Sequence, residues 1–411
     1  MLDTRKVICG MVRDLCGGLR GGWRGLLLIV LCAVLLLEAP AVGARRRAAP
    51  KGGQHPAIPA RAAGPATPAW IVINAATGDV LTSQDPDRPG APASMTKVML
   101  ALLVMEAVRD GQLKLSDTVQ TSRLASKMGG SQVYLKEGET FPVEDMMAAL
   151  LIGSANDAAT ALAERLTGSL EATIARMNER AATLKLTHTR FGSVHGLPPS
   201  PGQEGDVTTP RDMARLAQEL IKFPDILRWT SAPEAPFRGG TFILRNSNHL
   251  IGKFPGADGL KTGHFHEAGY NLAATAKRGE LRLIAVVMGA PTNAARFAEA
   301  ARLLGEGFSR YVEVTVVKAG APLGGEIRLP RAKTAFRAVA SSDLKVMVKR
   351  EERDAIQTTV DLQPGLRAPL GKGQPVGNLT IRVGDRQIAQ APVVTPAEVG
   401  RSFFWWLTPW R

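Results

Sequence analysis

The segment Ser94–Glu106 (SMTKVMLALLVME) carries the strongest fold signal in the sequence. It is apolar almost all round, which is typical of a helix that is buried on most sides. Ser94 and Lys97 lie three positions apart at its start, just after Pro92, and positions i and i+3 share one face of a helix. The Lys97 amine can therefore reach the Ser94 hydroxyl, as a serine nucleophile with a lysine base requires.

This S-x-x-K pattern is weak evidence when it stands alone. It recurs at Ser342-Asp343-Leu344-Lys345, which we interpret as part of a surface strand. A lone match is as compatible with coincidence as with a catalytic site. A helix N-terminus at Ser94 would favour an alkoxide there and would disfavour a second cation on Lys97.

A second candidate lies where two predicted helices, Val143–Leu151 and Asp157–Leu166, are interrupted. The break carries Ser154-Ala155-Asn156, an S-x-N pattern. A loop serine can relay a proton, and an asparagine amide can hold a substrate carbonyl. The alternative is a simple helix cap, because Ser and Asn are favoured at that position.

A third candidate, Lys261-Thr262-Gly263, lies on a predicted strand that follows Asp258-Gly259-Leu260. A strand that borders a cleft offers its backbone to an extended peptide. Gly263 would allow close approach of that substrate, and Lys261 and Thr262 supply a charge and a hydroxyl for a carboxylate. The alternative is a turn lysine in a hairpin. A phosphate-binding loop is excluded because the required glycine–lysine spacing is missing.

Outside these motifs, the sequence up to residue 311 predicts helices and antiparallel strands, and its composition changes from Glu313 onward. Turn residues 76–79 between two apolar segments predict a hairpin, and further strands and helices follow up to residue 311. These are strands at Asn271–Lys277 and Leu281–Met288, and helices at Leu170–Lys185, Thr209–Phe223 and Ala295–Tyr311. From Glu313 the segments are short and alternate between apolar and polar residues, which indicates a small all-β domain. They are Val314–Val317, Leu344–Val348, Thr358–Leu362 and Leu379–Val383.

The N-terminus has the three parts of a secretory signal peptide. Basic residues precede an apolar run, Leu26–Leu37, and small residues follow up to Ala44. We expect a signal peptide at 1–44 and a flexible linker rich in Ala, Pro and Arg at 45–68. An uncleaved anchor is the alternative, because Arg45-Arg46-Arg47 could hold the segment in place.

Composition limits the function classes further. The 411 residues are 45% hydrophobic and 21% charged, which is compatible with two globular domains and not with a disordered chain. All three cysteines precede residue 33, so the rest of the chain has no disulfide, thiolate nucleophile or cysteine metal site. The net charge of +14 suits an acidic polymer or anionic lipid, whereas 5% aromatic residues and the lack of known motifs disfavour nucleic acid.

The three motifs together are far more specific than any one of them. They occur in the order S-x-x-K, S-x-N and K-T-G, which is the signature of penicillin-binding proteins and class A β-lactamases. The chain resembles the low-molecular-mass penicillin-binding proteins that act as serine-type D-alanyl-D-alanine carboxypeptidases, over residues 69–395. Further segments carry the resemblance: Ala91-Pro92-Ala93, Asn156-Asp157-Ala158, Val194-His195-Gly196-Leu197, and Asp258-Gly259-Leu260-Lys261-Thr262-Gly263-His264 followed by Ala268-Gly269-Tyr270-Asn271.

The resemblance implies an α+β fold of the β-lactamase/transpeptidase type. Its catalytic domain, an antiparallel sheet with helices, would span 69–312, and a small all-β domain would span 313–395. The aromatic tail at 396–411 would either contact a membrane surface or fold back onto the β domain.

The resemblance also implies an acyl-enzyme mechanism on peptidoglycan stem peptides. Ser94 would attack the carbonyl between two D-alanines, with Lys97 as general base, and Ser154 would pass the proton to the departing D-alanine. Asn156 would hold the peptide, and backbone N–H groups of Ser94 and His264 would form the oxyanion hole. The residues expected to bind the terminal carboxylate are Lys261, Thr262 and Arg296, beside Gly263. Penicillins would acylate Ser94 as substrate mimics.

One departure from the family pattern concerns the residues after K-T-G-H. The family usually carries a small hydroxyl residue there, whereas this chain has Phe265 and then His266, which changes the expected shape beside the carboxylate pocket. His195, His264 and His266 do not make a metal motif, because Tyr270 stands where H-E-x-x-H needs its second histidine. We expect no metal and no cofactor.

Three other functions remain as alternatives. A D,D-endopeptidase would use the same residues, although the appended β domain argues against it. A β-lactamase is disfavoured because no E-x-x-x-N lies between the S-x-N and K-T-G motifs. A non-catalytic wall-binding protein has no need of intact Ser94, Lys97, Ser154 and Lys261. The expected location is the periplasm or the outer face of the cytoplasmic membrane.

Overall fold

The computed structural model describes residues 67–402. The predicted signal peptide, the linker up to residue 66 and the tail beyond residue 402 fall outside the described residues. Within 67–402, none of the helices has the length and apolar character needed to cross a membrane.

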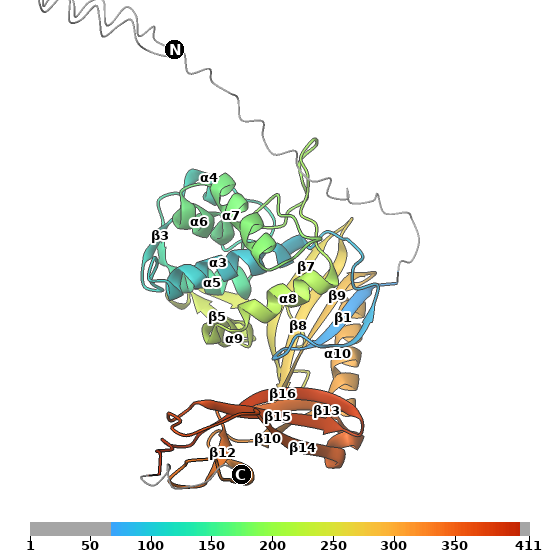
Figure 1. The fold of residues 1–411 in the computed structure, drawn as a ribbon. Helices are drawn as coiled ribbons and strands as arrows, with labels where there is room; N and C mark the ends of the chain where they lie inside the picture. The colour runs from blue at the N-terminus through green and yellow to red at the C-terminus, as the bar shows by residue number, and fades with distance from the viewer. Residues whose placement is uncertain (1–66, 403–411) are drawn as a thin grey trace, which may run out of the picture. The chain divides into compact units, whose positions relative to one another are not determined.

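A five-stranded antiparallel sheet forms the centre of the first part of the chain (Figure 1). Its strands, in spatial order, are β2 (Val80–Gln84), β1 (Ala69–Asn74), β9 (Leu281–Ala290), β8 (Gly269–Arg278) and β7 (Ala257–Phe265). Strand β1 pairs with β9 from Ala69 opposite Met288 to Asn74 opposite Leu283. Strand β1, the first described strand, thus pairs with a strand from the other end of the domain. Strand β7 lies at one edge of the sheet.

Both faces of this sheet are buried. Successive side chains of a strand point to opposite faces, and in β9 both sets are buried, each in a different core. In β9, Ile284, Val286 and Met288 join the large core under the helices. Leu283, Ala285 and Val287 join a second core with the apolar side of helix α10 (Asn293–Arg310). A strand buried on both faces explains why residues 281–290 read as a nearly continuous apolar run.

Helix α3 (Lys97–Arg109) lies inside the larger core, and every residue from Lys97 to Ala107 is buried. This confirms the prediction of a helix covered on most sides. The helices packed around it are α5 (Val143–Leu151), α6 (Asn156–Thr167), α7 (Leu170–Thr183) and α8 (Pro210–Leu220). Ser94 does not belong to α3 itself: it lies in a preceding 3₁₀ turn, η1 (Ala93–Thr96).

Short elements complete this part of the chain. They are β3 (Thr118–Gln120), α4 (Arg123–Ser126), β4 (Thr140–Pro142), α9 (Pro224–Thr230), β5 (Glu234–Phe237), η2 (Arg238–Gly240) and β6 (Phe242–Arg245). Strand β3 pairs with β4, and β5 pairs with β6. Neither of these two small hairpins is indicated by the apolar periodicity.

From residue 311 to residue 402, the last that the structure describes, the chain is all-β apart from a short 3₁₀ turn, η3 (Arg350–Ala355). One sheet has the order β11 (Pro322–Ile327), β12 (Phe336–Ala340), β16 (Arg386–Val394), β15 (Pro375–Val383) and β14 (Ile356–Leu362). A two-stranded sheet pairs β10 (Tyr311–Val317) with β13 (Leu344–Lys349). These strands bury their own core, including Val348, Leu379 and Ile381. The predicted fold class is confirmed: an α+β unit followed by a small all-β one.

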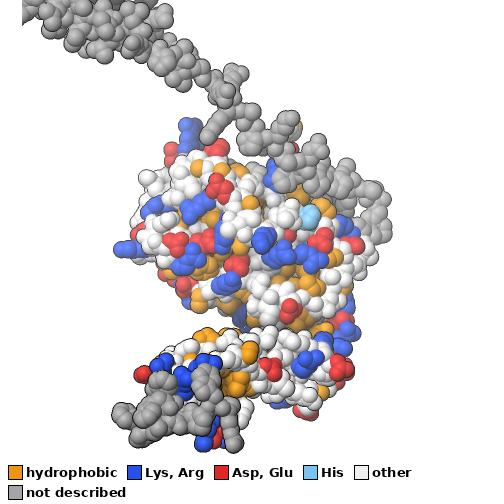
Figure 2. Space-filling model, in the orientation of Figure 1, with side chains coloured by type: hydrophobic (Ala, Val, Ile, Leu, Met, Phe, Trp, Pro, Cys, Tyr) orange, Lys and Arg blue, Asp and Glu red, His pale blue; other side chains and the backbone are white. Residues whose placement is uncertain are grey.

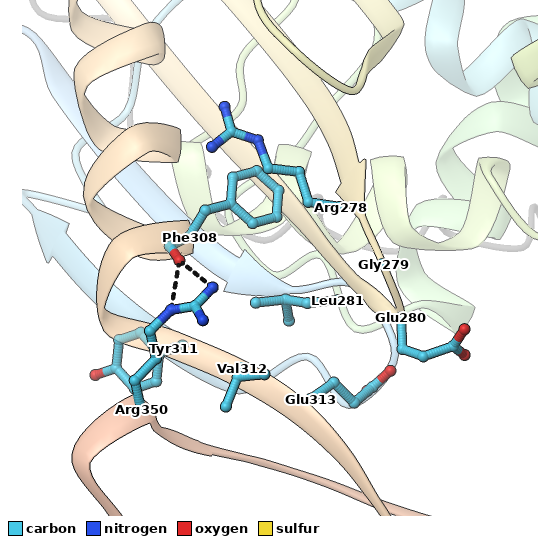
Figure 3. Close-up of a pocket in the computed structure, with 9 residues that line it drawn as sticks. All are labelled: Arg278, Gly279, Glu280, Leu281, Phe308, Tyr311, Val312, Glu313 and Arg350. Atoms are coloured by element: carbon cyan, nitrogen blue, oxygen red, sulfur yellow. Dashed lines mark hydrogen bonds between the residues drawn. The ribbon is translucent and has the colours of Figure 1, made fainter. Parts of the chain in front are cut away.

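Helix α10 passes directly into strand β10, and a cavity of about 400 Å³ lies beside this junction (Figure 3). On its wall, the Arg350 guanidinium donates two hydrogen bonds, of 3.2 and 3.0 Å, to the Phe308 carbonyl. Lys345, the lysine of the second S-x-x-K, lies in β13 and forms an ion pair with Glu280. Basic and acidic side chains share the face seen in Figure 2, so the net positive charge forms no single-sign patch there.

The edge strand β7 packs tightly against turn η1 at Gly263. A Cβ atom on Gly263 would lie 2.3 Å from the Pro92 carbonyl oxygen and 3.1 Å from the Ser94 nitrogen. The sequence led us to expect that Gly263 makes room for a substrate. In the structure it makes room for the backbone that carries Ser94.

This contact predicts that Gly263→Ala lowers the free energy of unfolding by about 1–3 kcal/mol, because a backbone carbonyl must shift to admit the methyl group. Gly305→Ala in α10 is the matched control, since a Cβ there meets nothing within 4 Å. Alanine in a helix should leave stability unchanged or raise it by up to about 1 kcal/mol. Urea unfolding measures both, and equal stability of the two variants would contradict the packing argument.

Candidate active site

The three sequence motifs lie side by side in the structure. Lys97 contacts Asn156, which joins S-x-x-K to S-x-N. Lys261 contacts Ser154, which joins S-x-N to K-T-G. Gly263 lies against the Ser94 backbone, which joins K-T-G to S-x-x-K. Residues from η1, the loop before α6 and the edge strand β7 therefore form one site.

The Lys97 amine is at the centre of this arrangement and its side chain is 0% exposed. Its Nζ lies 3.0 Å from Ser94 Oγ, 2.7 Å from Asn156 Oδ1 and 2.6 Å from the His195 carbonyl oxygen. All three partners are uncharged oxygens. A neutral amine has two N–H donors and one lone pair, so it can donate to the amide and carbonyl oxygens and accept from the Ser94 hydroxyl.

Burial and a neighbouring cation favour that neutral form. Desolvation holds the pKa of Lys97 well below its usual value of 10.5, and the positive charge of Lys261 lowers it further. The carboxylates of Asp206 and Asp157 act in the opposite direction and raise it. The net result is an amine that can accept a proton from Ser94.

Ser154 and Lys261 form the second half of the site. The Lys261 amine donates hydrogen bonds to Ser154 Oγ at 2.8 Å and to the Thr262 carbonyl at 3.0 Å. Its side chain is 1% exposed, and burial, followed by the charge of Arg296, lowers its pKa to about 7. Lys261 can therefore exchange a proton near neutral pH, and Ser154 is its direct partner.

The backbone at both serines is strained. Ala93, just before Ser94, has φ +51°, and Ser154 has φ +60°. Non-glycine residues with positive φ cost of the order of 1–3 kcal/mol and cluster at functional sites. In both positions the strained backbone orients a hydroxyl toward a buried lysine.

Arg296 lies beside the K-T-G strand, as its proposed role requires. It is 6% exposed, and its Nη1 donates to the carbonyls of Gly263 at 3.1 Å and Asn271 at 3.0 Å. Its Nε is buried without a hydrogen-bond partner. Burial lowers the pKa of Arg296 to about 10, so the group stays positive at neutral pH. The site thus holds a fixed cation that could meet a carboxylate.

Thr262 and His264 lie on the same strand, β7, on either side of Gly263. Thr262 Oγ1 shares a hydrogen bond of 2.7 Å with Ser247 Oγ. The His264 ring stacks on Tyr270 with centroids 3.9 Å apart, and burial together with Arg296 lowers its pKa. The unusual Phe265 is half-buried and ends strand β7 opposite Gly269.

Several residues that position the site could not be identified from the sequence. Asn271, known from the resemblance only as part of a motif, donates to the carbonyls of Ala91 and Pro92, at 2.8 and 3.3 Å, and so ties β8 to η1. Ser247 and Asp206 were not identified at all, and no spacing rule relates them to the motifs. Among residues 67–402, no group of three or more His, Cys, Asp or Glu side chains is arranged to hold a metal ion.

The low pKa of Lys261 predicts a pH-dependent stability. An unfolded lysine keeps its proton up to about its usual pKa of 10.5, whereas the folded one releases it near 7. The unfolded state binds more protons between these values, so the free energy of unfolding should rise with pH, by about 1.4 kcal/mol per unit from this group. Lys261→Met should remove that slope.

Urea unfolding at pH 7.5, 8.5 and 9.5 measures this slope in the wild type and the variant. Lys277→Met, which removes an exposed lysine from strand β8, is the matched control. Parallel pH dependence of the wild type and Lys261→Met would show that Lys261 is not desolvated in this way.

Comparison with known proteins agrees with this geometry. Residues 57–292 match the family Peptidase S11, described as D-alanyl-D-alanine carboxypeptidase. Residues 311–401 match the family described as penicillin-binding protein 5, C-terminal domain. The second match begins at Tyr311, the first residue of strand β10.

Individual relatives lead to the same family. D-alanyl-D-alanine carboxypeptidase DacF of Bacillus subtilis is 36% identical over 81% of this chain and 86% of its own length. The crystal structure of penicillin-binding protein 5 from Haemophilus influenzae has a TM-score of 0.69 at 29% identity, over 81% of this chain and 97% of that one. Penicillin-binding protein D2 from Listeria monocytogenes, solved in an ampicillin-bound form, has a TM-score of 0.54 at 34% identity. The match covers 58% of this chain and 96% of that one.

The match over most of the chain, together with the joined S-x-x-K, S-x-N and K-T-G motifs, places this protein in the Peptidase S11 family, as a serine-type D-alanyl-D-alanine carboxypeptidase.

Proposed function

We propose that Ser94 is the nucleophile of this carboxypeptidase, that Lys97 is its general base, and that the substrate is a peptidoglycan stem peptide ending in D-alanyl-D-alanine. The observation that carries the proposal is the 3.0 Å approach of Ser94 Oγ to the amine of a fully buried lysine. The low pKa of Lys97 supports it, because a protonated amine could not accept the hydroxyl proton.

In the acylation step, Ser94 Oγ forms a bond to the carbonyl carbon between the two D-alanines, and its proton moves to Lys97. The tetrahedral intermediate then collapses: the C–N bond breaks, and the departing nitrogen of D-alanine takes a proton through Ser154. The contact between Ser154 and Lys261 supports this role, because a lysine with a pKa near 7 can resupply the proton.

Binding of the substrate is assigned to the remaining residues. Asn156 presents its amide beside the base, with Nδ2 donating to the Gly129 carbonyl at 2.7 Å. Backbone N–H groups of Ser94 and His264 would form the oxyanion hole, and the close packing of β7 on η1 supports their proximity. Lys261, Thr262 and Arg296 would bind the terminal carboxylate, and the positive charge of Arg296 beside Gly263 supports this.

Water would then hydrolyse the ester: its oxygen bonds to the acyl carbon, the Ser94 Oγ–C bond breaks, and Ser94 recovers a proton. A β-lactam would acylate the same serine. The ampicillin-bound form of the similar Listeria monocytogenes protein supports this extension to β-lactams. The slow step that makes β-lactams inhibitors would be the loss of this acyl group.

The site of action and the domain limits belong to the same proposal. The proposed limits are 69–312 for the catalytic domain and 313–395 for the β domain; strand β10 begins two residues before the second limit, at Tyr311, and Val399 is buried in the core of the β strands. Export across the cytoplasmic membrane, to the periplasm or the outer membrane face, is inferred from the signal-peptide pattern at 1–44, and membrane contact from the aromatic tail.

Ser94→Ala tests the assignment. It should lower D-alanine release from a pentapeptide by at least roughly 10⁴-fold and abolish covalent labelling by a fluorescent penicillin, because no nucleophile remains. Ser342→Ala is the matched control, since it removes the exposed serine of the other S-x-x-K. It should retain both activities.

Two outcomes would change the conclusion. Covalent labelling that persists in Ser94→Ala would refute the nucleophile. Faster cleavage of cross-linked peptide dimers than of pentapeptides by the wild type would identify an endopeptidase that uses the same residues.

A further inference from the structure

Asp206 is a buried carboxylate that lies outside all three motifs and is 7% exposed. Four neutral donors converge on it. Oδ1 accepts from the backbone N–H groups of Gly192, at 2.7 Å, and Ser193, at 2.8 Å. Oδ2 accepts from the hydroxyls of Thr96, at 2.6 Å, and Ser193, at 2.9 Å. A carboxylate with four donors is an acceptor in a fixed orientation.

The backbone around Asp206 is itself held in place. The next residue, Val207, exchanges two hydrogen bonds with Arg190, at 2.8 and 2.9 Å. Thr208 pairs in the same way with Gly90, which precedes the nucleophile turn. The residues that follow Asp206 are therefore anchored to two other segments of the chain, at Arg190 and at Gly90.

The donors bound by Asp206 lie on two segments that both reach Lys97. Thr96 is the residue before Lys97 in the S-x-x-K motif. Ser193 begins the turn that ends at Gly196, whose N–H donates to Ser193 Oγ at 2.8 Å. The carbonyl of His195, inside that turn, accepts from Lys97 Nζ at 2.6 Å.

A glycine completes the contact between these segments. Gly196 has φ +81°, and a Cβ there would lie 2.0 Å from the Ala93 carbonyl oxygen. The 193–196 turn therefore packs directly on η1, and Asp206 links the two through its hydrogen bonds to Thr96 and Ser193. Removing the carboxylate would leave the turn without its tie to Thr96.

Burial raises the pKa of Asp206, and above that pKa its negative charge acts on Lys97 without direct contact. The charged and titratable groups that face Lys97 are Lys261 from β7, Asp157 from α6, His195 from the turn, and Asp206. The two carboxylates raise the pKa of Lys97, while burial and Lys261 lower it. His195 contributes no charge near neutral pH, because burial and Lys97 lower its pKa to about 4.

We propose that Asp206 is a positioning residue for the general base: it clamps Thr96 to the 193–196 turn, so that the Lys97 amine stays within reach of the His195 carbonyl and the Ser94 hydroxyl. The proposal rests on the role of Lys97 proposed above. It assigns a function in the reaction to a residue about 110 positions from the nucleophile in sequence.

Asp206→Asn tests the charge, because the amide keeps the shape and can still bond to rotatable hydroxyls. The probe is the second-order rate of acylation by fluorescent penicillin between pH 5 and pH 10. With the negative charge removed, Lys97 loses its proton more easily, so the acid limb of the rate profile should move to lower pH.

Asp212→Asn is the matched control. Asp212 is 1% exposed and accepts hydrogen bonds from the His188 N–H and the Thr189 hydroxyl, both at 2.9 Å, but it binds neither Thr96 nor the 193–196 turn. The acid limb of the acylation-rate profile of Asp212→Asn should coincide with that of the wild type. An unchanged midpoint in Asp206→Asn, or equal shifts in both variants, would overturn the charge component.

Asp206→Ala and Thr96→Val test the clamp. Misplacing the base should lower the plateau rate by about 10- to 100-fold in Asp206→Ala, and by a smaller factor in Thr96→Val, which loses one of the four donors. Thr96→Val keeps the test available if Asp206→Ala does not fold. Plateau rates equal to that of Asp212→Asn in the folded variants would refute the clamp.

The result is separable from the proposed function. Labelling that depends on Ser94, combined with wild-type profiles in the Asp206 variants, would overturn only this inference. Labelling that survives in Ser94→Ala would overturn the proposed function first.

Discussion

The burial of the Lys97 amine among neutral oxygens is the interaction on which the rest of the site depends. Its contacts with Ser94, Asn156 and His195 bring together three segments that are distant in sequence. Desolvation disfavours the ammonium, so the fold uses burial to make a base from a residue that is ordinarily protonated. Lys261 repeats this device on the leaving-group side, where it holds Ser154.

The sheet and the helical core each supply half of this environment. Strand β7 lies at the sheet edge and places Lys261 and Gly263 against the nucleophile turn, while the helices bury α3 behind Lys97. The positive φ angles at Ala93 and Ser154 show that the backbone is strained at both hydroxyls. A large, well-packed core can hold such strain because the surrounding contacts determine one conformation.

Functional residues that lie a few positions apart in the chain could be predicted from the sequence. Ser94 and Lys97, and likewise the buried character of α3, follow from local rules, and the resemblance supplied the pairing of distant motifs. The contacts of Asp206, Ser247 and Arg296 could not be predicted from the residues, because each joins segments through the tertiary fold. The contact of Gly263 with the nucleophile turn could not be predicted for the same reason: a glycine indicates a close approach but does not identify what approaches.

The most direct measurement is the titration of Lys97 itself, followed by NMR of the labelled side-chain Cε and Nζ and assigned by the signal lost in Lys97→Met. Burial of Lys97 should give a pKa well below 10.5, with the neutral amine as the form that precedes acylation. A Lys97 that keeps its proton up to about pH 10 would refute its role as the general base, because Ser94 would then have no base within reach.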